Sequence, residues 1–110
     1  MEALMKGDIV VLPFPFSDLS GFKSRPAVIV ADMQGDDVVL CQITGTQRDD
    51  DYTIHLDDYN FIHGNLQGES LIRANKIFTI DKRIIFYKVG MLKDEKLKEV
   101  KNKIVDLIRR

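Results

Sequence analysis

Short apolar segments separated by polar turns dominate the first 90 residues of the chain. Each segment is rich in β-branched or aromatic residues, which is the pattern of β-strands. Seven segments fit this description: residues 8–12, 26–31, 37–43, 52–56, 70–72, 76–80 and 84–89. The apolar residues of segments 26–31 and 37–43 form continuous runs instead of alternating with polar ones, so we expect both segments at the centre of a sheet. The Gly-containing connection at 32–36 predicts a hairpin between them.

Two stretches interrupt this series and are predicted to lack strands. Pro13 and Pro15 disfavour regular pairing, so we expect the first strand to end at Leu12 and a loop to cover residues 13–24. A loop of that length in a small domain is usually functional or disordered. The second stretch, residues 57–68, is largely polar.

From Asp94 onwards the hydrophobic period changes to that of a helix. Apolar residues recur every three or four positions, at Leu97, Val100, Ile104, Leu107 and Ile108. Asp94 and Glu95 suit the positive N-terminal end of this helix, and Arg109 and Arg110 suit its negative C-terminal end. We therefore predict a mainly β fold, in which a small, strongly curved antiparallel barrel is closed on one side by a C-terminal helix.

Length and composition are those of one ordinary domain. The chain has 110 residues, of which 45% are hydrophobic, so we expect a single domain over 1–110. No apolar run approaches the roughly 20 residues of a membrane-spanning helix, and no secretory signal opens the sequence. The single cysteine, Cys41, cannot form an internal disulfide. These features favour a cytoplasmic protein without membrane contact.

The net charge of −1 conceals a strong segregation along the sequence. Residues 32–70 carry nine acids against one base, Arg48, and the remaining residues sum to +7. Acidic loops often serve only to keep turns solvated. The alternative is a bipolar molecule whose basic part binds a polyanion, with the acid-rich middle lying away from it.

Familiar catalytic and cofactor signatures are missing from the sequence. It contains no Gly-rich phosphate loop and no Cys-x-x-Cys pair, so we expect neither a cofactor nor a metal. Cys41 lies inside an apolar run and is interpreted as a core residue. His55 and His63 have no partner at a diagnostic spacing, and consecutive acids at 49–51 are interpreted as a solvated loop tip.

One arginine and one threonine stand out by their positions. Arg25 directly precedes Pro26 at the mouth of an apolar strand, which holds the arginine in an extended conformation. Thr44 ends another strand just before Gly45, so the two side chains would be close if these strands were neighbours. A guanidinium and a hydroxyl suit a phosphodiester substrate. A surface arginine that merely begins a strand is an equally good interpretation of the local residues.

The sequence resembles the MazF/PemK family of type II toxin–antitoxin toxins, which are mRNA interferases. The similarity covers nearly the whole chain and rests on several motifs in order. These motifs are Lys6-Gly-Asp-Ile-Val-Val-Leu-Pro-Phe-Pro-Phe16, Lys23-Ser-Arg-Pro-Ala-Val-Ile-Val30, Gln42-Ile-Thr44, Glu69-Ser-Leu-Ile-Arg73, Lys76-Ile-Phe-Thr-Ile-Asp81 and Val89-Gly-Met-Leu92. The resemblance implies the Src-homology-3-like barrel shared by the MazF, CcdB and Kid toxins.

The resemblance also implies an activity, partners and residue roles. It implies a homodimer that cleaves single-stranded RNA at short sequences without metal, and that a cognate antitoxin inhibits. Arg25 and Thr44 match the catalytic arginine and threonine of the family. The implied reaction is attack by the RNA 2′-hydroxyl on its own phosphate, which leaves a 2′,3′-cyclic phosphate and a 5′-hydroxyl. Auxiliary or RNA-binding positions would be Asp18, Lys23, Gln42, Arg73 and Asn75.

The sequence departs from the family pattern at two places. Asn75 stands where some members carry an aspartate two residues after the functional arginine, and an amide cannot exchange a proton as a carboxylate does. In the loop before Arg25, Asp18 is the only carboxylate. These departures leave two alternatives open: a toxin of the same fold that blocks a protein such as DNA gyrase, and an RNA-binding protein without nuclease activity. Base stacking on Phe14, Phe16 or Phe22 would favour the latter.

Overall fold

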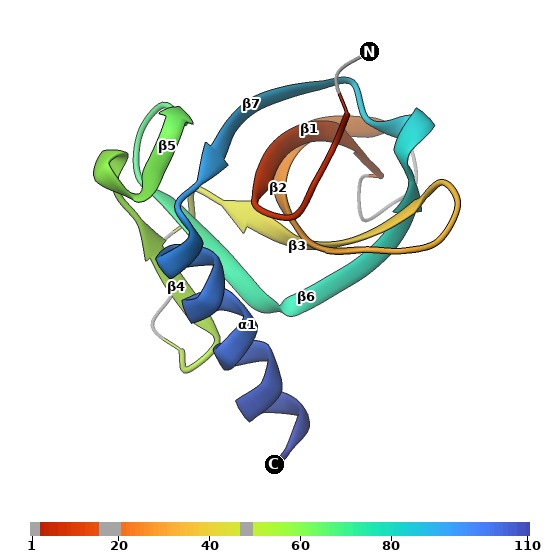
Figure 1. The fold of residues 1–110 in the computed structure, drawn as a ribbon. Coiled ribbons are helices and arrows are strands. Elements are labelled where there is room, and N and C mark those ends of the chain that lie inside the picture. The colour runs from red at the N-terminus through yellow and green to blue at the C-terminus, as the bar shows by residue number, and fades with distance from the viewer. Residues whose placement is uncertain (1–2, 16–20, 47–49) are drawn as a thin grey trace.

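The computed structural model describes residues 3–15, 21–46 and 50–110 as a curled sheet with one helix (Figure 1). The strands carry most of the chain, and two single-turn 3-10 helices, η1 and η2, interrupt them. In chain order the elements are β1 (Asp8–Pro15), β2 (Phe22–Asp32), β3 (Asp37–Thr44), β4 (Thr53–Leu56), η1 (Asp58–Asn60), β5 (Phe61–Gly64), β6 (Ser70–Asp81), η2 (Lys82–Ile84), β7 (Tyr87–Leu92) and α1 (Asp94–Ile108).

The seven strands form one antiparallel sheet in the order β4-β6-β3-β2-β1-β7-β5. Figure 1 shows this sheet curling into a half-barrel, with β4 and β5 at its two ends. The prediction of a mainly β fold with a C-terminal helix is confirmed. So are the central positions of β2 and β3 and the hairpin between them.

The predicted loop over residues 13–24 is wrong at both ends, because β1 continues through both prolines to Pro15 and β2 begins at Phe22. Its middle, residues 16–20, lies outside the described residues. Pro13 pairs with Ser24 and Pro15 with Phe22, so β2 also begins earlier than expected. The carbonyl of Val11 accepts a hydrogen bond from the Phe86 amide, on the side of β1 that faces away from β2. The backbone groups of Pro13 and Pro15 point to the same side of β1 as those of Val11, because the three residues alternate along the strand. On that side β7 pairs with β1 only as far as Val11. Their missing N–H groups therefore fall on a free strand edge, where proline is tolerated.

The later strands also differ from the prediction. Segments 70–72 and 76–80 belong to a single strand, β6, and the residues between them form a bulge instead of a turn. The segment expected from residue 84 begins at Tyr87, since Ile84 lies in η2. β5 lies within the polar stretch where no strand was expected. It pairs with β7, but only two of its four residues are apolar, so the sequence contains no apolar run long enough to predict it.

Two apolar clusters lie on opposite faces of the sheet. The first cluster includes Ile9, Val28, Cys41 and Ile72, and α1 covers it with Leu97 and Val100. The second cluster fills the concave inside of the half-barrel, with Val10, Leu12, Ala27, Ile29, Val38, Leu40 and Ile85. The last turn of α1 extends beyond the sheet (Figure 1), and Ile108 is 72% exposed. Among the residues that the structure describes, no helix is long and apolar enough to cross a membrane.

A single extra residue interrupts the pairing of β2 with β3. Ile29 pairs with Leu40 and Ala31 with Val39, so Val30 bulges between two regular stretches. From Ile29 back to Ala27 the register is regular again, ending with Ala27 opposite Gln42. The bulge therefore sets the alignment of the strand ends beyond it.

Replacing Gly64 with alanine is expected to destabilise the edge formed by β5 and β7. Gly64 has a φ of +74°, and an added Cβ would meet the Val89 carbonyl oxygen and, at 2.6 Å, the Gly90 Cα. Gly35→Ala is the matched control, because Gly35 has a φ of +79° but nothing within 4 Å. The control should cost about 1 kcal/mol of unfolding free energy, from backbone strain alone. Gly64→Ala should cost about 2 kcal/mol more, from overpacking, in urea unfolding; equal costs would contradict this packing.

Candidate functional site

Arg25 and Thr44 lie on adjacent strands, as the site hypothesis requires. β2 and β3 pair with Ala27 opposite Gln42. Extending this register by two residues, beyond the last paired residues, sets Arg25 opposite Thr44. Directly opposite residues of an antiparallel pair project to the same face of a sheet. The fold therefore brings together two residues that are 19 positions apart in the sequence.

Both residues project to the concave face of the half-barrel. Arg25 pairs with Leu12, a member of the second cluster, and lies two residues before Ala27 of the same cluster. Along β3, Gln42 and Thr44 follow Leu40 at two-residue intervals, so they share its face. Lys23 pairs with Phe14, lies on this face as well and is exposed to solvent. The second cluster thus passes into a polar end that carries Lys23, Arg25, Gln42 and Thr44.

Local contacts fix the Thr44 hydroxyl beside the end of its strand. Thr44 is only 9% exposed, and its Oγ1 accepts a hydrogen bond from the Thr46 amide at 3.2 Å. This contact uses one acceptor site and leaves the hydroxyl proton available to donate. Arg25 is half-buried at the adjacent strand end. A guanidinium and a hydroxyl proton on neighbouring strand ends are two kinds of donor suited to a phosphate oxygen.

An open pocket adjoins this polar end of the concave face. It has a volume of about 340 Å³, and its apolar walls include Leu12, Phe14, Phe78 and Ile80. Two polar side chains also line it, Gln42 from β3 and Lys76 from β6. The Phe14 and Phe78 rings meet edge to face, with centroids 5.1 Å apart. We call this space the concave pocket.

The bulge in β6 gathers further polar residues opposite Gln42. Cys41 pairs with Ile77 and Ile43 with Ile72, so four residues of β6, positions 73–76, face a single residue of β3. Bulges of this kind re-aim side chains and are common beside active sites. The Asn75 Oδ1 is buried there without a hydrogen-bond partner. The structure thus brings Gln42, Arg73, Asn75 and Lys76 to one irregular segment between β3 and β6.

Arg73 is buried and paired with a carboxylate from the acid-rich middle of the chain. Its side chain is 10% exposed, and an Nη lies 3.7 Å from an Asp50 carboxylate oxygen. Its Nε is buried without a hydrogen-bond partner. The expectation that the acid-rich segment lies away from the basic site is therefore wrong at Asp50. Tertiary pairing of β4 with β6 sets Arg73 beside Thr53 and brings the preceding acids with it.

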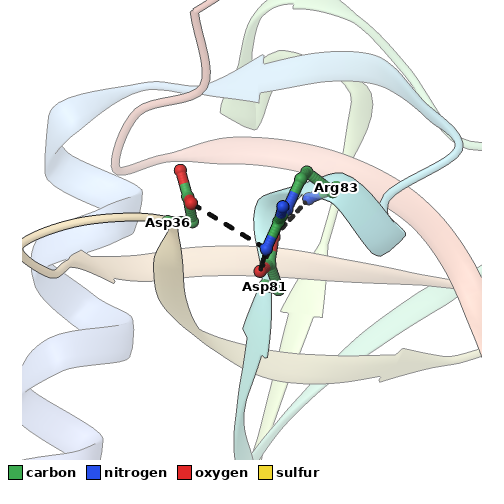
Figure 2. Close-up of polar contacts among 3 residues, drawn as sticks. All are labelled: Asp36, Asp81 and Arg83. Atoms are coloured by element: carbon green, nitrogen blue, oxygen red, sulfur yellow. Dashed lines mark hydrogen bonds and ion pairs between the residues drawn. The ribbon is translucent and has the colours of Figure 1, made fainter.

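A second charge cluster lies at the other end of β3. Figure 2 shows Arg83, on η2, reaching both Asp81 and Asp36. Its guanidinium contacts an Asp81 carboxylate oxygen at 2.6 Å and an Asp36 oxygen at 4.0 Å. Hydrogen bonds from the side chain and backbone of Arg83 lower the pKa of Asp81 to about 2. Asp81 pairs with Asp37 at the start of β3, whereas Thr44 ends that strand, so this cluster is remote from Arg25.

Cys41 and the two histidines do not belong to the candidate site. Cys41 is fully buried, and desolvation raises the pKa of its thiol to about 12, which suits a core residue and not a nucleophile. His55 and His63 are exposed. Within 3–15, 21–46 and 50–110, no group of three His, Cys, Asp or Glu side chains is placed to hold a metal ion. Asp18 lies outside the described residues.

Lys76 is a polar pocket residue that the sequence analysis did not assign to the candidate site. The sequence placed it at the start of a separate strand, and nothing in the pattern indicated that β6 bulges there. The period-2 alternation of Lys76, Phe78 and Ile80 is the available signal, because it puts the lysine on the face of two pocket residues.

Comparison with known proteins gives the family and the fold of the chain. The family model for PemK-like, MazF-like toxins of type II toxin–antitoxin systems matches residues 5–108. No curated protein matches the sequence. Among solved structures, an endoribonuclease in complex with its cognate antitoxin, from mycobacterial species, is 15% identical. It aligns over 96% of this chain and 95% of its own, with a TM-score of 0.76.

Two further structures have the same fold. MazE–MazF from Deinococcus radiodurans is 16% identical, with 97% of each chain covered and a TM-score of 0.75. The Mycobacterium tuberculosis toxin MazF-mt6 is 17% identical, with 91% of this chain and 96% of that one covered, and a TM-score of 0.68. The family model covers nearly the whole chain, and the curled seven-stranded sheet with its C-terminal helix matches these toxins throughout. The chain therefore belongs to the PemK-like, MazF-like toxins of type II toxin–antitoxin systems.

Proposed function

We propose that this toxin is a metal-independent, sequence-selective endoribonuclease that cleaves single-stranded mRNA and thereby inhibits growth. The observation that carries the proposal is the pairing of β2 with β3, in which Ala27 lies opposite Gln42. Continued by two residues, this register would set Arg25 opposite Thr44 on the concave face. The similar solved structures include two endoribonucleases by name, which supports the activity.

The proposed reaction is attack by a ribose 2′-hydroxyl on the adjacent phosphorus. The O–P bond to the 5′-oxygen of the next nucleotide breaks, which leaves a 2′,3′-cyclic phosphate and a 5′-hydroxyl. The attacking group already belongs to the substrate, so orientation and charge stabilisation supply much of the catalysis. Arg25 would stabilise the charge that develops on the phosphoryl oxygens, and Thr44 would orient the phosphate through its hydroxyl proton.

Attack by the 2′-hydroxyl also needs a group that accepts its proton. A guanidinium stays protonated and Asn75 carries an amide, so neither is assigned as a general base. Arg73 already faces Asp50 at 3.7 Å and is assigned to support of the site and not to direct charge stabilisation. Lys23, exposed on the same face as Arg25, would bind the flanking phosphates.

The proposed protein partners are a cognate antitoxin and a second copy of the chain. Solved relatives that contain an antitoxin support the first partner. Exposed apolar side chains at the end of α1 support the second, since Val105 is 41% and Ile108 72% exposed. Both residues line an open groove of about 550 Å³ between α1 and the sheet. A small domain that leaves such a surface uncovered commonly buries it in a dimer.

Incubation of the purified protein with RNA in excess EDTA tests the activity. We expect cleavage, with 5′ ends that a polynucleotide kinase labels directly because they carry hydroxyl groups. Sequencing those ends would give the recognised sequence. Intact RNA in this assay would contradict the proposal. Growth arrest with intact cellular RNA would then favour a toxin that blocks a protein such as DNA gyrase, and RNA binding without cleavage would favour a binding module.

A further inference from the structure

The concave pocket has a lining that the proposed phosphate chemistry does not use. Its walls are mainly apolar, with Leu12 buried at 1% exposure and the Phe14–Phe78 pair half-buried. Among the described residues that line it, only Gln42 and Lys76 have side chains that form hydrogen bonds. A mostly apolar cavity with a few convergent polar groups is typical of a site for a flat organic molecule. A nucleobase has this chemistry, since its faces are apolar and its edge carries donors and acceptors.

The position of the pocket relative to Arg25 and Thr44 favours a base of the same RNA. Gln42 and Thr44 are alternate residues on one face of β3, so their Cα atoms are about 7 Å apart. A single nucleotide can span this separation between its phosphate and its base. One wall of the pocket adjoins the proposed reaction site, because the lining residue Leu12 pairs directly with Arg25.

The two polar groups restrict which base fits. The Lys76 ammonium can only donate hydrogen bonds, whereas the Gln42 amide can both donate and accept. A carbonyl oxygen on the pairing edge, as in uracil or guanine, would accept from Lys76. The amino group that adenine or cytosine carries at the equivalent place is a donor and would face a second donor.

We propose that the concave pocket binds one unpaired base of the RNA substrate, and that Gln42 and Lys76 select a uracil or a guanine there. The proposal rests on the proposed function, because the base belongs to the RNA held at Arg25 and Thr44. It makes Gln42 and Lys76 specificity-determining residues. Neither is required for bond cleavage itself.

Base preference can be measured without cleavage, which separates this proposal from the catalytic one. A random pool of 2′-O-methyl RNA lacks the attacking hydroxyl and stays intact. The pool is bound to the protein, and the bound fraction is sequenced. The proteins compared are the unmodified chain, Gln42→Leu, Lys76→Met and the control Lys98→Met. Lys98 lies exposed on α1, outside the concave face, so its variant removes the same charge elsewhere.

We expect the unmodified protein to enrich uracil or guanine at one position of the bound RNA. Gln42→Leu and Lys76→Met should each reduce that enrichment by roughly ten-fold, which is a usual size for a base-specific contact. Lys98→Met should leave it unchanged. Circular dichroism shows whether each variant folds. If Gln42→Leu does not fold, Lys76→Met still tests the proposal, because Lys76 is exposed and its replacement should not disturb the core.

Three results would overturn the base assignment. In the first, the unmodified protein enriches no base at any position. In the second, it enriches adenine or cytosine at the position that responds to these variants. In the third, a folded Lys76→Met variant keeps the full enrichment. The uracil and guanine outcomes distinguish a pyrimidine from a purine occupant. If base selection follows the pocket but unmodified RNA is not cleaved, the catalytic proposal fails and the pocket assignment stands.

Discussion

Arg25→Ala should reduce the rate of RNA cleavage by about 100-fold or more, the usual effect of removing one donor that stabilises developing negative charge. Arg25 is half-buried at the start of β2, so no core packing depends on its guanidinium. The thermal midpoint should therefore change little. Single-turnover cleavage of a short RNA, at saturating enzyme and in EDTA, measures the chemical step separately from binding.

Arg83→Ala is the matched control for that experiment. It removes an arginine of equal charge at the remote end of β3, where Arg83 contacts Asp81 and Asp36. Its cleavage rate should stay close to that of the unmodified protein. Arg25→Lys should recover only part of the rate, because an ammonium lacks the two-pronged donor geometry of a guanidinium. Undiminished cleavage by Arg25→Ala would remove this residue from the mechanism.

Lys88→Met should cost about 3 kcal/mol of unfolding free energy without touching the site. Lys88 lies on β7, and its Nζ is 3.0 Å from an Asp8 carboxylate oxygen. The Asp8 side chain is fully buried, and its other oxygen accepts a hydrogen bond from the Met5 amide. Methionine keeps most of the side-chain volume but leaves a carboxylate buried without its cation, and that is strongly destabilising. Urea unfolding at neutral pH measures the loss.

Two further variants isolate the charge effect at this pair. Lys82→Met breaks an ion pair with Asp32 in which both side chains are partly exposed, so it should cost less than about 1 kcal/mol. Adding Asp8→Asn to Lys88→Met removes the stranded charge and should restore at least half of the loss. Equal costs for Lys82→Met and Lys88→Met would show that burial of Asp8 does not matter.

Much of the fold could be predicted because it depends on local pattern. The apolar runs that became β2 and β3 lie at the centre of the sheet, and the Leu97 and Val100 face of α1 packs on the first cluster. The proximity of Arg25 and Thr44 was predicted only on the condition that their strands are neighbours. The hairpin meets that condition, since strands joined by a short turn pair with each other.

The missing parts depend on tertiary context. The sequence predicts that the first strand ends before Pro13, but Pro13 pairs with Ser24. Whether a proline breaks pairing depends on which edge of the strand its nitrogen faces, and a single sequence does not specify that edge. The sequence predicts two segments, 70–72 and 76–80, in place of the single strand β6, because Arg73 and the residues after it interrupt the apolar pattern at the bulge. Its pairing with Asp50 arises from an edge strand that arrives from elsewhere in the chain. The concave pocket likewise exists only once β1, β3 and β6 are assembled.

Because Val30 is an extra residue in β2, the alignment of Arg25 with Thr44 depends on the number of residues in that strand. Without that extra residue, the pairing of Ala31 with Val39 would continue unshifted and would set Arg25 opposite Gly45, which has no side chain. Thr44 would then face Pro26 and project to the other side of the sheet. One inserted or deleted residue in β2 would therefore separate the two side chains of the proposed site while leaving both residues in the sequence. Among related toxins, residue identity at these two positions is thus an incomplete criterion for activity, and the number of residues between them has to be compared as well.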